Sequence, residues 1–216
     1  MSSPHVSFAS LSPETFAKTL TLSSAGKTFT TTGWKVGWAV GPSNLVKPMM
    51  TLQQWVTFSC PSVTQDAIAT SLVKAREPYG GFPSFYSYLK SSYKAKRALL
   101  SGALSAAGLK PIAPLGGFFI CADTSAVTSV PAETYEEDSA ASPRPMTRDW
   151  ALARHFVQRG PKVAVIPPSA FYCKENKWLA KDYVRFAFCK TDDMLEDGAK
   201  RLREWKAGED KNSKKE

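Results

Sequence analysis

The residues best placed to do chemistry lie in one short stretch, Leu22–Thr28 (LSSAGKT), where a lysine follows hydroxyl side chains and a glycine. Two kinds of site use similar patterns. A phosphate-binding loop of the GxxxxGK[ST] type would end in Gly26-Lys27-Thr28, but it needs a glycine where this sequence has Thr21. A Ser-x-x-Lys acyl-transfer site would use Ser24 and Lys27, but the SDN and KTG elements that accompany it are missing from the sequence.

A third chemistry is a lysine that condenses with an aldehyde cofactor. The amine of Lys27, on a turn of small residues, could form a Schiff base with a carbonyl group. A cofactor phosphate would need hydroxyl, amide and cationic partners. Such side chains lie close by, at Ser23, Ser24, Thr28 and Lys35, and residues 15–65 contain no Asp or Glu. An exposed lysine in a polar loop explains the same residues without any chemistry, so the turn alone leaves both interpretations open.

The elements that must position this turn follow from periodicity and turn residues. In the first half we expect strands at Thr19–Leu22 and Trp34–Val40, a helix after Pro42 with Ser43 as its N-cap, a helix with Pro61 at its first position, and a long amphipathic helix at Phe85–Ala107 followed by Gly108 as C-cap.

In the second half the pattern predicts strands at Gly117–Cys121, Val163–Ile166 and Tyr183–Phe188, and helices at Asp149–Gln158 and Asp192–Trp205. Val127–Arg148 is rich in Ser, Pro and Glu and predicts a loop or insertion that is flexible in part. Alternating strands and helices favour an α/β or α+β arrangement with a boundary inside or just after the long helix.

Composition and charge restrict the class of protein. Of 216 residues, 43% are hydrophobic and 22% charged, as in soluble globular proteins, and no run is apolar enough to span a membrane. The net charge of +9 would suit an anionic ligand, but no RNP, zinc-finger or KH pattern occurs, so we expect no nucleic-acid partner. Four scattered cysteines, two histidines and the lack of a secretory pattern predict no metal site and an intracellular protein, cytoplasmic or mitochondrial.

Residues 24–38 (SAGKTFTTTGWKVGW) closely resemble the pyridoxal-phosphate lysine signature of class I aminotransferases. More narrowly they resemble the kynurenine aminotransferase branch, also called glutamine transaminase K or cysteine-S-conjugate β-lyase. The resemblance continues through GPSNLVKPM, FSCPSVTQDAIA, LKPIAPLGGFFI and DYVRFAFCKTDDMLEDGAKRLREW, and so covers nearly the whole chain apart from residues 123–148.

The resemblance implies the α/β fold of type I pyridoxal-phosphate-dependent transferases. Residues 1–84 would be the C-terminal part of the large domain, residues 85–107 a bridging helix, and residues 108–216 the small α+β domain. That small domain would carry an insertion at residues 123–148 and a basic tail at residues 207–216.

Residue by residue, the resemblance also implies a cofactor site for pyridoxal 5′-phosphate. Lys27 would bind the cofactor covalently and move a proton between it and the substrate α-carbon. The hydroxyl of Ser24 would bind the phosphate. Lys35 stands at the phosphate-binding base, where many class I enzymes have arginine; this exchange keeps the charge and loses the bidentate fork.

The substrate site that the resemblance implies contains Arg185 and Phe58. Arg185 would grip the substrate α-carboxylate, because its planar fork meets a carboxylate with two hydrogen bonds. Without the resemblance, a salt bridge at a strand edge is the alternative role for this arginine. Phe58 would line the pocket across a homodimer interface, and its neighbour Ser59 stands where some members have histidine.

The implied activity moves an amino group from kynurenine, glutamine or another aromatic or sulfur-containing amino acid to a 2-oxo acid. The family places an Asp-x-x-Tyr pair before its lysine, and that aspartate keeps the pyridine nitrogen protonated. Here the first aspartate is Asp66 and the first tyrosine is Tyr79. We therefore expect a truncated chain with exposed apolar faces and little activity alone; an inactive fragment that serves as an interaction module and a chain completed by a separate partner are the alternatives.

Overall fold

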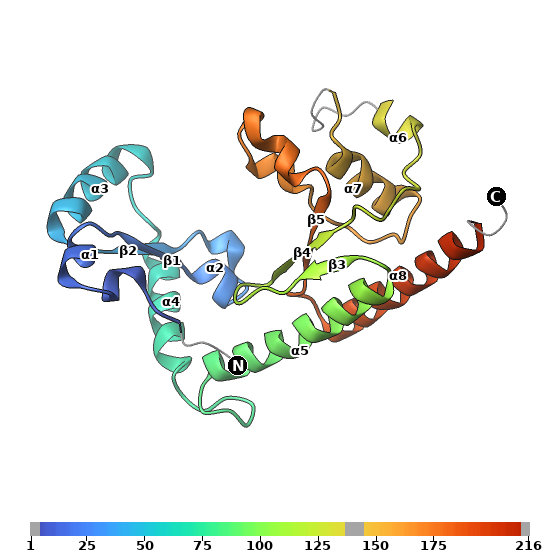
Figure 1. Ribbon diagram of the computed structural model, residues 1–216. Helices are drawn as coiled ribbons and strands as arrows, with labels where there is room; N and C mark the ends of the chain where they lie inside the picture. Colours follow the sequence, from blue (N-terminus) through green and yellow to red (C-terminus); the bar gives the residue numbers. More distant parts are fainter. Residues whose placement is uncertain (1–4, 137–144, 213–216) are drawn as a thin grey trace. The chain divides into compact units, whose positions relative to one another are not determined.

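The computed structural model describes residues 5–136 and 145–212, and the chain divides into two compact units, residues 1–88 and residues 89–216 (Figure 1). The boundary lies near the beginning of the longest helix, α5 (Phe85–Ala106). Helix α5 agrees with the predicted range to within one residue, and Gly108 follows it with a positive φ of 76°, as a glycine C-cap requires.

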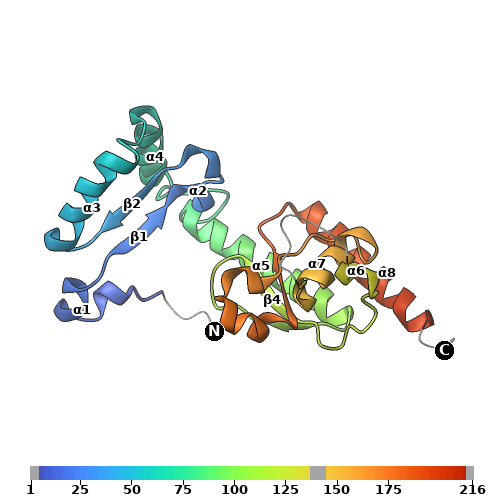
Figure 2. The same cartoon turned by 90° about the horizontal axis from the view of Figure 1, so that it is seen from above.

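Unit 1 (residues 1–88) contains a two-stranded antiparallel sheet and several helices (Figure 2). Its elements are η1 (Phe8–Ser10), α1 (Pro13–Ala17), β1 (Thr21–Ser24), α2 (Ala25–Thr28), η2 (Thr32–Trp34), β2 (Gly37–Val40), α3 (Ser43–Val56) and α4 (Ser62–Lys74). In the sheet, Thr21 lies opposite Val40 and Ser24 lies opposite Gly37.

The strand and helix ends in unit 1 differ from the sequence predictions. Strand β1 begins and ends two residues later than expected, because Ser23 and Ser24 pair with β2 and do not form a turn. Strand β2 is shorter than expected, because η2 occupies part of the predicted range and Lys35 adopts a left-handed conformation with φ of 55°.

Two predicted helix starts were also off by one residue. Ser43 is the first residue of α3, and the N-cap position belongs to Pro42, which makes no side-chain capping bond. Pro61 is the N-cap of α4, so that helix begins at Ser62.

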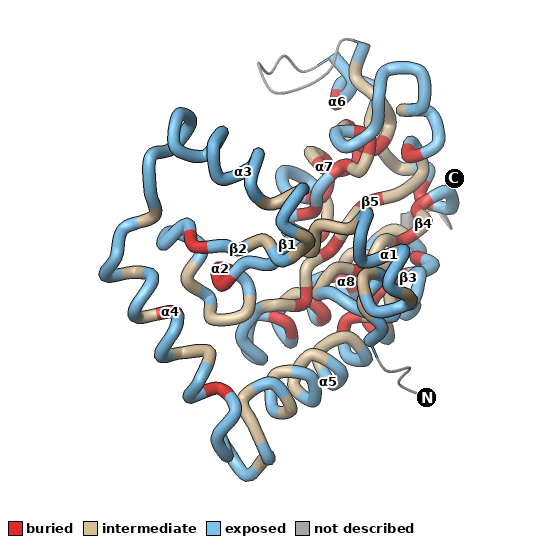
Figure 3. The backbone as a smooth tube through the Cα atoms, turned by 90° about the vertical axis from the view of Figure 1, so that its left-hand side faces the viewer, coloured by how far each residue is buried: buried red, intermediate tan, exposed pale blue. Residues whose placement is uncertain are grey.

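The buried core of unit 1 is small. It consists of Ala25, Val36 and Ile68, with Phe29, Cys60 and Leu72 packed against them. Helix α3 buries no residue at all, and Figure 3 shows most of its length in the colour of exposed residues. On that helix Trp55 is 83% exposed. The expected exposure of apolar faces is therefore confirmed for this unit.

Unit 2 (residues 89–216) contains a three-stranded antiparallel sheet in the order β3-β4-β5. With the larger part of α5, its elements are β3 (Lys110–Ile112), β4 (Phe119–Asp123), α6 (Glu133–Glu136), α7 (Arg148–Gln158), η3 (Pro168–Phe171), η4 (Lys174–Ala180), β5 (Tyr183–Ala187) and α8 (Asp192–Asn212). The register places Ile112 opposite Cys121, and Cys121 opposite Arg185.

One face of this sheet is packed and the other is more open. Alternate residues on β4 and β5 are fully buried: Ile120, Ala122, Val184 and Phe186. They join a core with apolar residues of α5, α7 and α8, and α5 and α8 lie side by side in Figure 1. The other set of alternate residues, including Phe119, Cys121 and Arg185, is only partly buried. The candidate substrate residue Arg185 thus lies on the open face.

Several elements of unit 2 differ from the predictions. The three-residue strand β3 was not predicted, and the strand expected at Val163–Ile166 is wrong, since only Ile166 forms a bridge, with Arg185. Helix α8 runs beyond the predicted end at Trp205 to Asn212, into the segment expected to be a tail.

The segment predicted as a loop or insertion takes part in the packing where the structure describes it; residues 137–144 lie outside the described part. Helix α6 forms within it, and Thr124 and Val127 are buried. The guanidinium of Arg148 donates to the carbonyl oxygens of Thr124 and Val127, each at 2.7 Å. It also lies 3.3 Å from a carboxylate oxygen of Asp182. The segment is therefore not a loop throughout, since α6 lies within it.

Candidate functional site

The turn that carries Lys27 begins where β1 ends. The hydroxyl of Ser24 accepts a hydrogen bond from the amide of Gly26 at 3.2 Å and donates one to the carbonyl of Val36 at 3.4 Å. The same carbonyl accepts from the amide of Ala25 at 3.1 Å. These bonds fix the start of the one-turn helix α2 against β2, so the position of Lys27 in its last turn is set by the strand pair.

A close backbone approach explains why this turn contains a glycine. A Cβ added to the buried Gly26 would lie 3.1 Å from the Cα of Thr32. The hydroxyl of Thr32 in turn donates to the carbonyl of Gly26 at 3.4 Å. The segment after Lys27 therefore folds back onto the segment before it, and a larger residue at position 26 would push the two apart.

The charges in this part of unit 1 are cationic and unpaired. Lys27 and Lys35 are both exposed, and neither makes a hydrogen bond or ion pair with any residue that the structure describes. No acidic residue occurs between Thr15 and Gln65 to compete for them. A hydroxyl and two lysine side chains are the residue types that suit a phosphate and an aldehyde, so Ser24, Lys27 and Lys35 fit pyridoxal 5′-phosphate.

The predicted substrate residue Phe58 lies in the loop between α3 and α4. Its side chain is 85% exposed, and its backbone has a positive φ of 65°. A non-glycine residue in the left-handed region is uncommon and costs conformational energy. The neighbouring Ser59 is also exposed, and its amide donates to the carbonyl of Thr57 at 2.9 Å.

In unit 2, the backbone of Arg185 is held from both sides. Its amide donates to the carbonyl of Ile166, and its carbonyl accepts from the amide of Ile166, both at 3.0 Å. On the other side Arg185 lies opposite Cys121 of β4. Because both backbone groups of Arg185 bond to Ile166, its pairing with Cys121 is of the non-hydrogen-bonded kind, in which side chains come closest.

The side chain of Arg185 has no acidic partner among the residues that the structure describes. Its guanidinium carbon lies 4.1 Å from the ring centre of Phe119 and 4.7 Å from that of Phe171. Its Nε is buried and makes no hydrogen bond with any described residue. Among residues 5–136 and 145–212 it forms no ion pair, so the alternative of a strand-edge salt bridge is not what the structure shows.

Two neighbours on this face respond to the local charges. Burial raises the pKa of the Cys121 thiol above its ordinary value, and the positive charge of Arg185 opposes that rise. Hydrogen bonds from Ser125 lower the pKa of Asp123, with smaller contributions from Lys110 and Arg148. Among the described residues, Asp123 forms no ion pair with Arg185.

The aromatic residues around Arg185 were not predicted as part of the site. The sequence predicts a strand that contains Phe119 and indicates no role for Phe171. For Phe119 a signal existed in the sequence, because once β4 and β5 are paired, alternation puts it on the same face as Arg185. No local pattern marks Phe171, which reaches this face through the turn η3.

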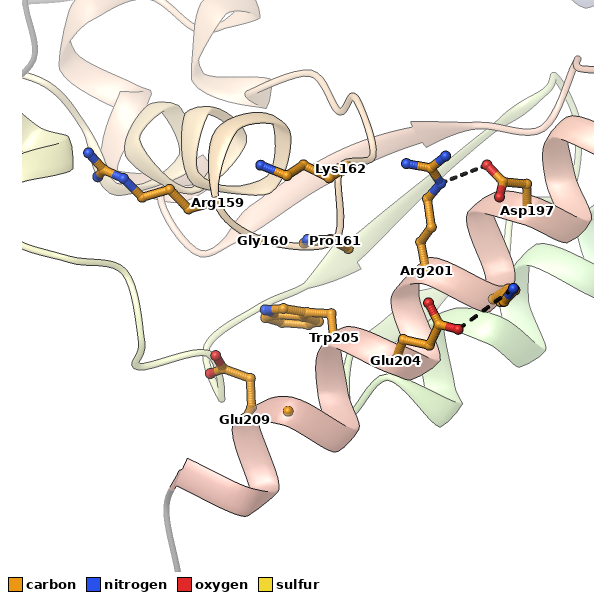
Figure 4. A pocket seen from close by; sticks show the side chains of 11 residues that line it. Arg159, Gly160, Pro161, Lys162, Asp197, Arg201, Glu204, Trp205 and Glu209 are labelled. Carbon is orange, nitrogen blue, oxygen red and sulfur yellow. Dashed lines mark hydrogen bonds and ion pairs between the residues drawn. The ribbon is translucent and has the colours of Figure 1, made fainter. Parts of the chain in front are cut away.

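A separate cavity of about 560 Å³ lies in unit 2 between α8 and the loop after α7 (Figure 4). Its cations are mostly engaged: Arg201 bonds Asp197 at 2.6 Å, and Lys200 lies 3.8 Å from Glu204. None of the site residues predicted from the sequence lines it. We therefore assign this cavity no role in binding the cofactor or the substrate.

Two kinds of feature are absent from the described part of the chain. No described helix is long and apolar enough to cross a membrane. Within the same residues, no group of three His, Cys, Asp or Glu side chains is placed to hold a metal ion.

Comparison with known proteins identifies the family. The model of the family described as aminotransferase class I and II matches residues 3–202, and the chain belongs to this family. Kynurenine–oxoglutarate transaminase of Dictyostelium discoideum is 38% identical over 192 residues, covering 89% of this chain and 42% of the relative. Kynurenine–oxoglutarate transaminase 1 of Homo sapiens is 33% identical over 205 residues, covering 94% and 46%. The chain thus spans under half the length of these curated relatives.

Solved structures agree with this assignment. Bna3p of Saccharomyces cerevisiae matches with a TM-score of 0.79 at 30% identity, covering 92% of this chain and 45% of that one. YbdL of Escherichia coli, identified with a methionine aminotransferase function, matches with a TM-score of 0.71 at 28% identity, covering 93% and 45%. The expected fold class, that of type I pyridoxal-phosphate-dependent transferases, is confirmed.

Proposed function

We propose that this chain carries the cofactor lysine and the carboxylate-binding arginine of an aminotransferase. The enzyme would transfer an amino group from kynurenine, glutamine or another aromatic or sulfur-containing amino acid to a 2-oxo acid. The observation that carries the proposal is Arg185, a partly buried guanidinium on an open sheet face, with an unbonded Nε and no acidic partner among the described residues. An arginine kept in this state is ready to receive a carboxylate.

The cofactor would be pyridoxal 5′-phosphate, held in unit 1. When bound, it supplies an aldehyde that condenses with amines and a ring that accepts electron density from the substrate α-carbon. Ser24 would turn its hydroxyl from the carbonyl of Val36, 3.4 Å away, and donate it to the phosphate, and Lys35 would balance the phosphate charge. Lys27 would provide the amine that anchors the cofactor, and its Nζ would hold and return the proton taken from the substrate α-carbon.

The working enzyme would be a homodimer in which Phe58 contacts the partner subunit's substrate. Two observations support this role. Phe58 is 85% exposed, and its backbone has a positive φ of 65°, which holds the ring on the surface of unit 1 at a cost in conformational energy. A large exposed aromatic next to an exposed apolar helix is the composition expected of a protein interface.

The direct test is chemical trapping of the cofactor. The full chain is incubated with pyridoxal 5′-phosphate, reduced with borohydride and mapped by peptide mass spectrometry. We expect the label at Lys27, its loss in Lys27→Ala, and no change in Lys74→Ala, which removes another exposed lysine of unit 1. A label spread evenly over surface lysines, or one that persists in Lys27→Ala, would contradict the proposal.

A further inference from the structure

The short segment from Ile166 to Phe171 controls both the backbone and the side chain of Arg185. Ile166 exchanges both of its backbone hydrogen bonds with Arg185 at 3.0 Å. Five residues later the ring of Phe171 lies 4.7 Å from the guanidinium carbon. The segment thus contacts Arg185 at two points, through the backbone and through the side chain. A shift of the segment would therefore move the arginine.

A buried carboxylate fixes this segment to helix α7. Asp149 is fully buried, and one of its oxygens accepts the backbone amide of Ser169 at 2.9 Å. The other oxygen accepts the hydroxyl of Thr147 at 2.6 Å. Ser169 is also fully buried and lies within η3, two residues before Phe171. The position of the Phe171 ring is thus set by α7.

The second ring comes from the sheet. Phe119 lies on β4, diagonal to Arg185 and on the same face, with its ring centre 4.1 Å from the guanidinium carbon. Aromatic rings attract a guanidinium through their faces but offer it no strong hydrogen-bond acceptor. They can therefore hold the guanidinium in place and leave its N–H donors free to bond a ligand. An Asp or Glu partner would occupy those donors.

We propose that Phe119 and Phe171 form an aromatic clamp that positions the guanidinium of Arg185 to bind the substrate carboxylate. This rests on the proposed carboxylate-binding function of Arg185. Phe171 acts through the arginine and is a positioning residue. Because the rings limit the tilt of the guanidinium without pairing with it, the donors are oriented before a ligand arrives, and less conformational freedom is lost on binding.

Nuclear magnetic resonance of the full chain tests the clamp. The probe ligand is 3-phenylpropionate, and its uncharged amide is the control ligand. The Nε–Hε resonance of Arg185 is assigned by its disappearance in the Arg185→Lys variant. We expect Phe171→Ala to move this resonance and to weaken 3-phenylpropionate binding about three- to tenfold, the effect of one lost cation–π contact. Phe171→Tyr should restore both, and Tyr172→Ala, which removes the neighbouring exposed ring of the same turn, should change neither.

The outcomes separate the clamp from the function on which it rests. If 3-phenylpropionate binds Phe171→Ala as tightly as the wild-type chain and the Arg185 resonance does not move, the clamp is overturned and the proposed function stands. A wild-type Arg185 resonance that does not respond to 3-phenylpropionate overturns the carboxylate role itself, and the clamp with it. Thermal unfolding of each variant verifies that the 65%-exposed Phe171 can be removed without unfolding the chain.

Discussion

Replacing Asp149 by alanine should destabilise unit 2 through the loss of buried hydrogen bonds. The side chain is 0% exposed and joins α7 to η3 through the amide of Ser169. Without it the buried amide has no acceptor, and a buried donor left unpaired costs about 1–3 kcal/mol. The hydroxyl of Thr147 loses its acceptor as well, but it retains the hydroxyl of Ser169 at 3.3 Å. Alanine also avoids the cost of burying a carboxylate, which offsets part of this loss, so we expect a net loss of about 1–2 kcal/mol.

Asp149→Asn is the matched control for this prediction. The amide oxygen of asparagine can accept from the backbone amide of Ser169, and its NH₂ group can donate to the hydroxyl of Thr147, which then acts as an acceptor. The variant keeps the shape and both hydrogen bonds, and it loses only a negative charge in the first turn of α7. That charge is worth about 0.3–1 kcal/mol at a helix N-terminus, so the expected loss is small.

The assay combines two measurements on the full chain. Urea unfolding gives the free energy of each variant, and hydrogen exchange of the Ser169 amide reports the local bond. We expect this amide to lose its protection in Asp149→Ala and to keep it in Asp149→Asn. An alanine variant within about 0.5 kcal/mol of the wild type would refute the reasoning. An asparagine variant as unstable as the alanine variant would show that charge, and not hydrogen bonding, is what matters.

Two further predictions concern pH and backbone packing. Burial lowers the pKa of His155 below 6.5, opposed by Glu209 and reinforced by Arg159 and Lys162. The unfolded chain therefore binds a proton that the folded chain does not, and the free energy of unfolding should fall as pH drops below about 6.5 toward the folded-state pKa. In urea unfolding, His155→Gln should flatten the slope of this free energy against pH. An unchanged slope would exclude His155 as its source. In unit 1, a Cβ at Gly37 would lie 2.9 Å from the carbonyl oxygen of Ser23, whereas at Gly33 it would meet nothing within 4 Å. Gly37→Ala should lower the free energy of unfolding by about 1–3 kcal/mol and reduce cofactor trapping at Lys27, while Gly33→Ala should leave the trapping unchanged. Equal trapping in both variants would show that the strand pair does not support the turn.

The sequence by itself determined the features that depend on neighbouring residues. Helix α5 was predicted to within one residue, because its apolar stripe and the glycine after it are local signals. Strand β5 was predicted for the same reason, since its alternation and aromatic content mark a strand whatever its partner. The motif around Lys27 and the segment around Arg185 identified the family, because residue types at fixed spacing carry the chemistry.

Where a feature depends on a partner distant in sequence, only the tertiary structure decided it. Strand β3 has three residues, one of them Pro111, and it exists only because β4 is there to pair with it. The start of β1 moved by two residues because the register with β2 overrode the local turn signal of Ser23 and Ser24. Local propensity is weak beside a ladder of hydrogen bonds, so such ends cannot be placed from one segment alone.

The surroundings of Arg185 show most clearly which features depend on neighbouring residues and which depend on tertiary structure. Its type and its strand were evident from the sequence, and the resemblance implied its role. The rings of Phe119 and Phe171 reach it only because β4 pairs with β5 and because Asp149 holds η3 against α7. Those contacts join segments that lie far apart along the chain. These segments come together only when the chain folds. The entropy lost in closing the loops between them is offset by burial of the apolar core that β4, β5 and α7 share.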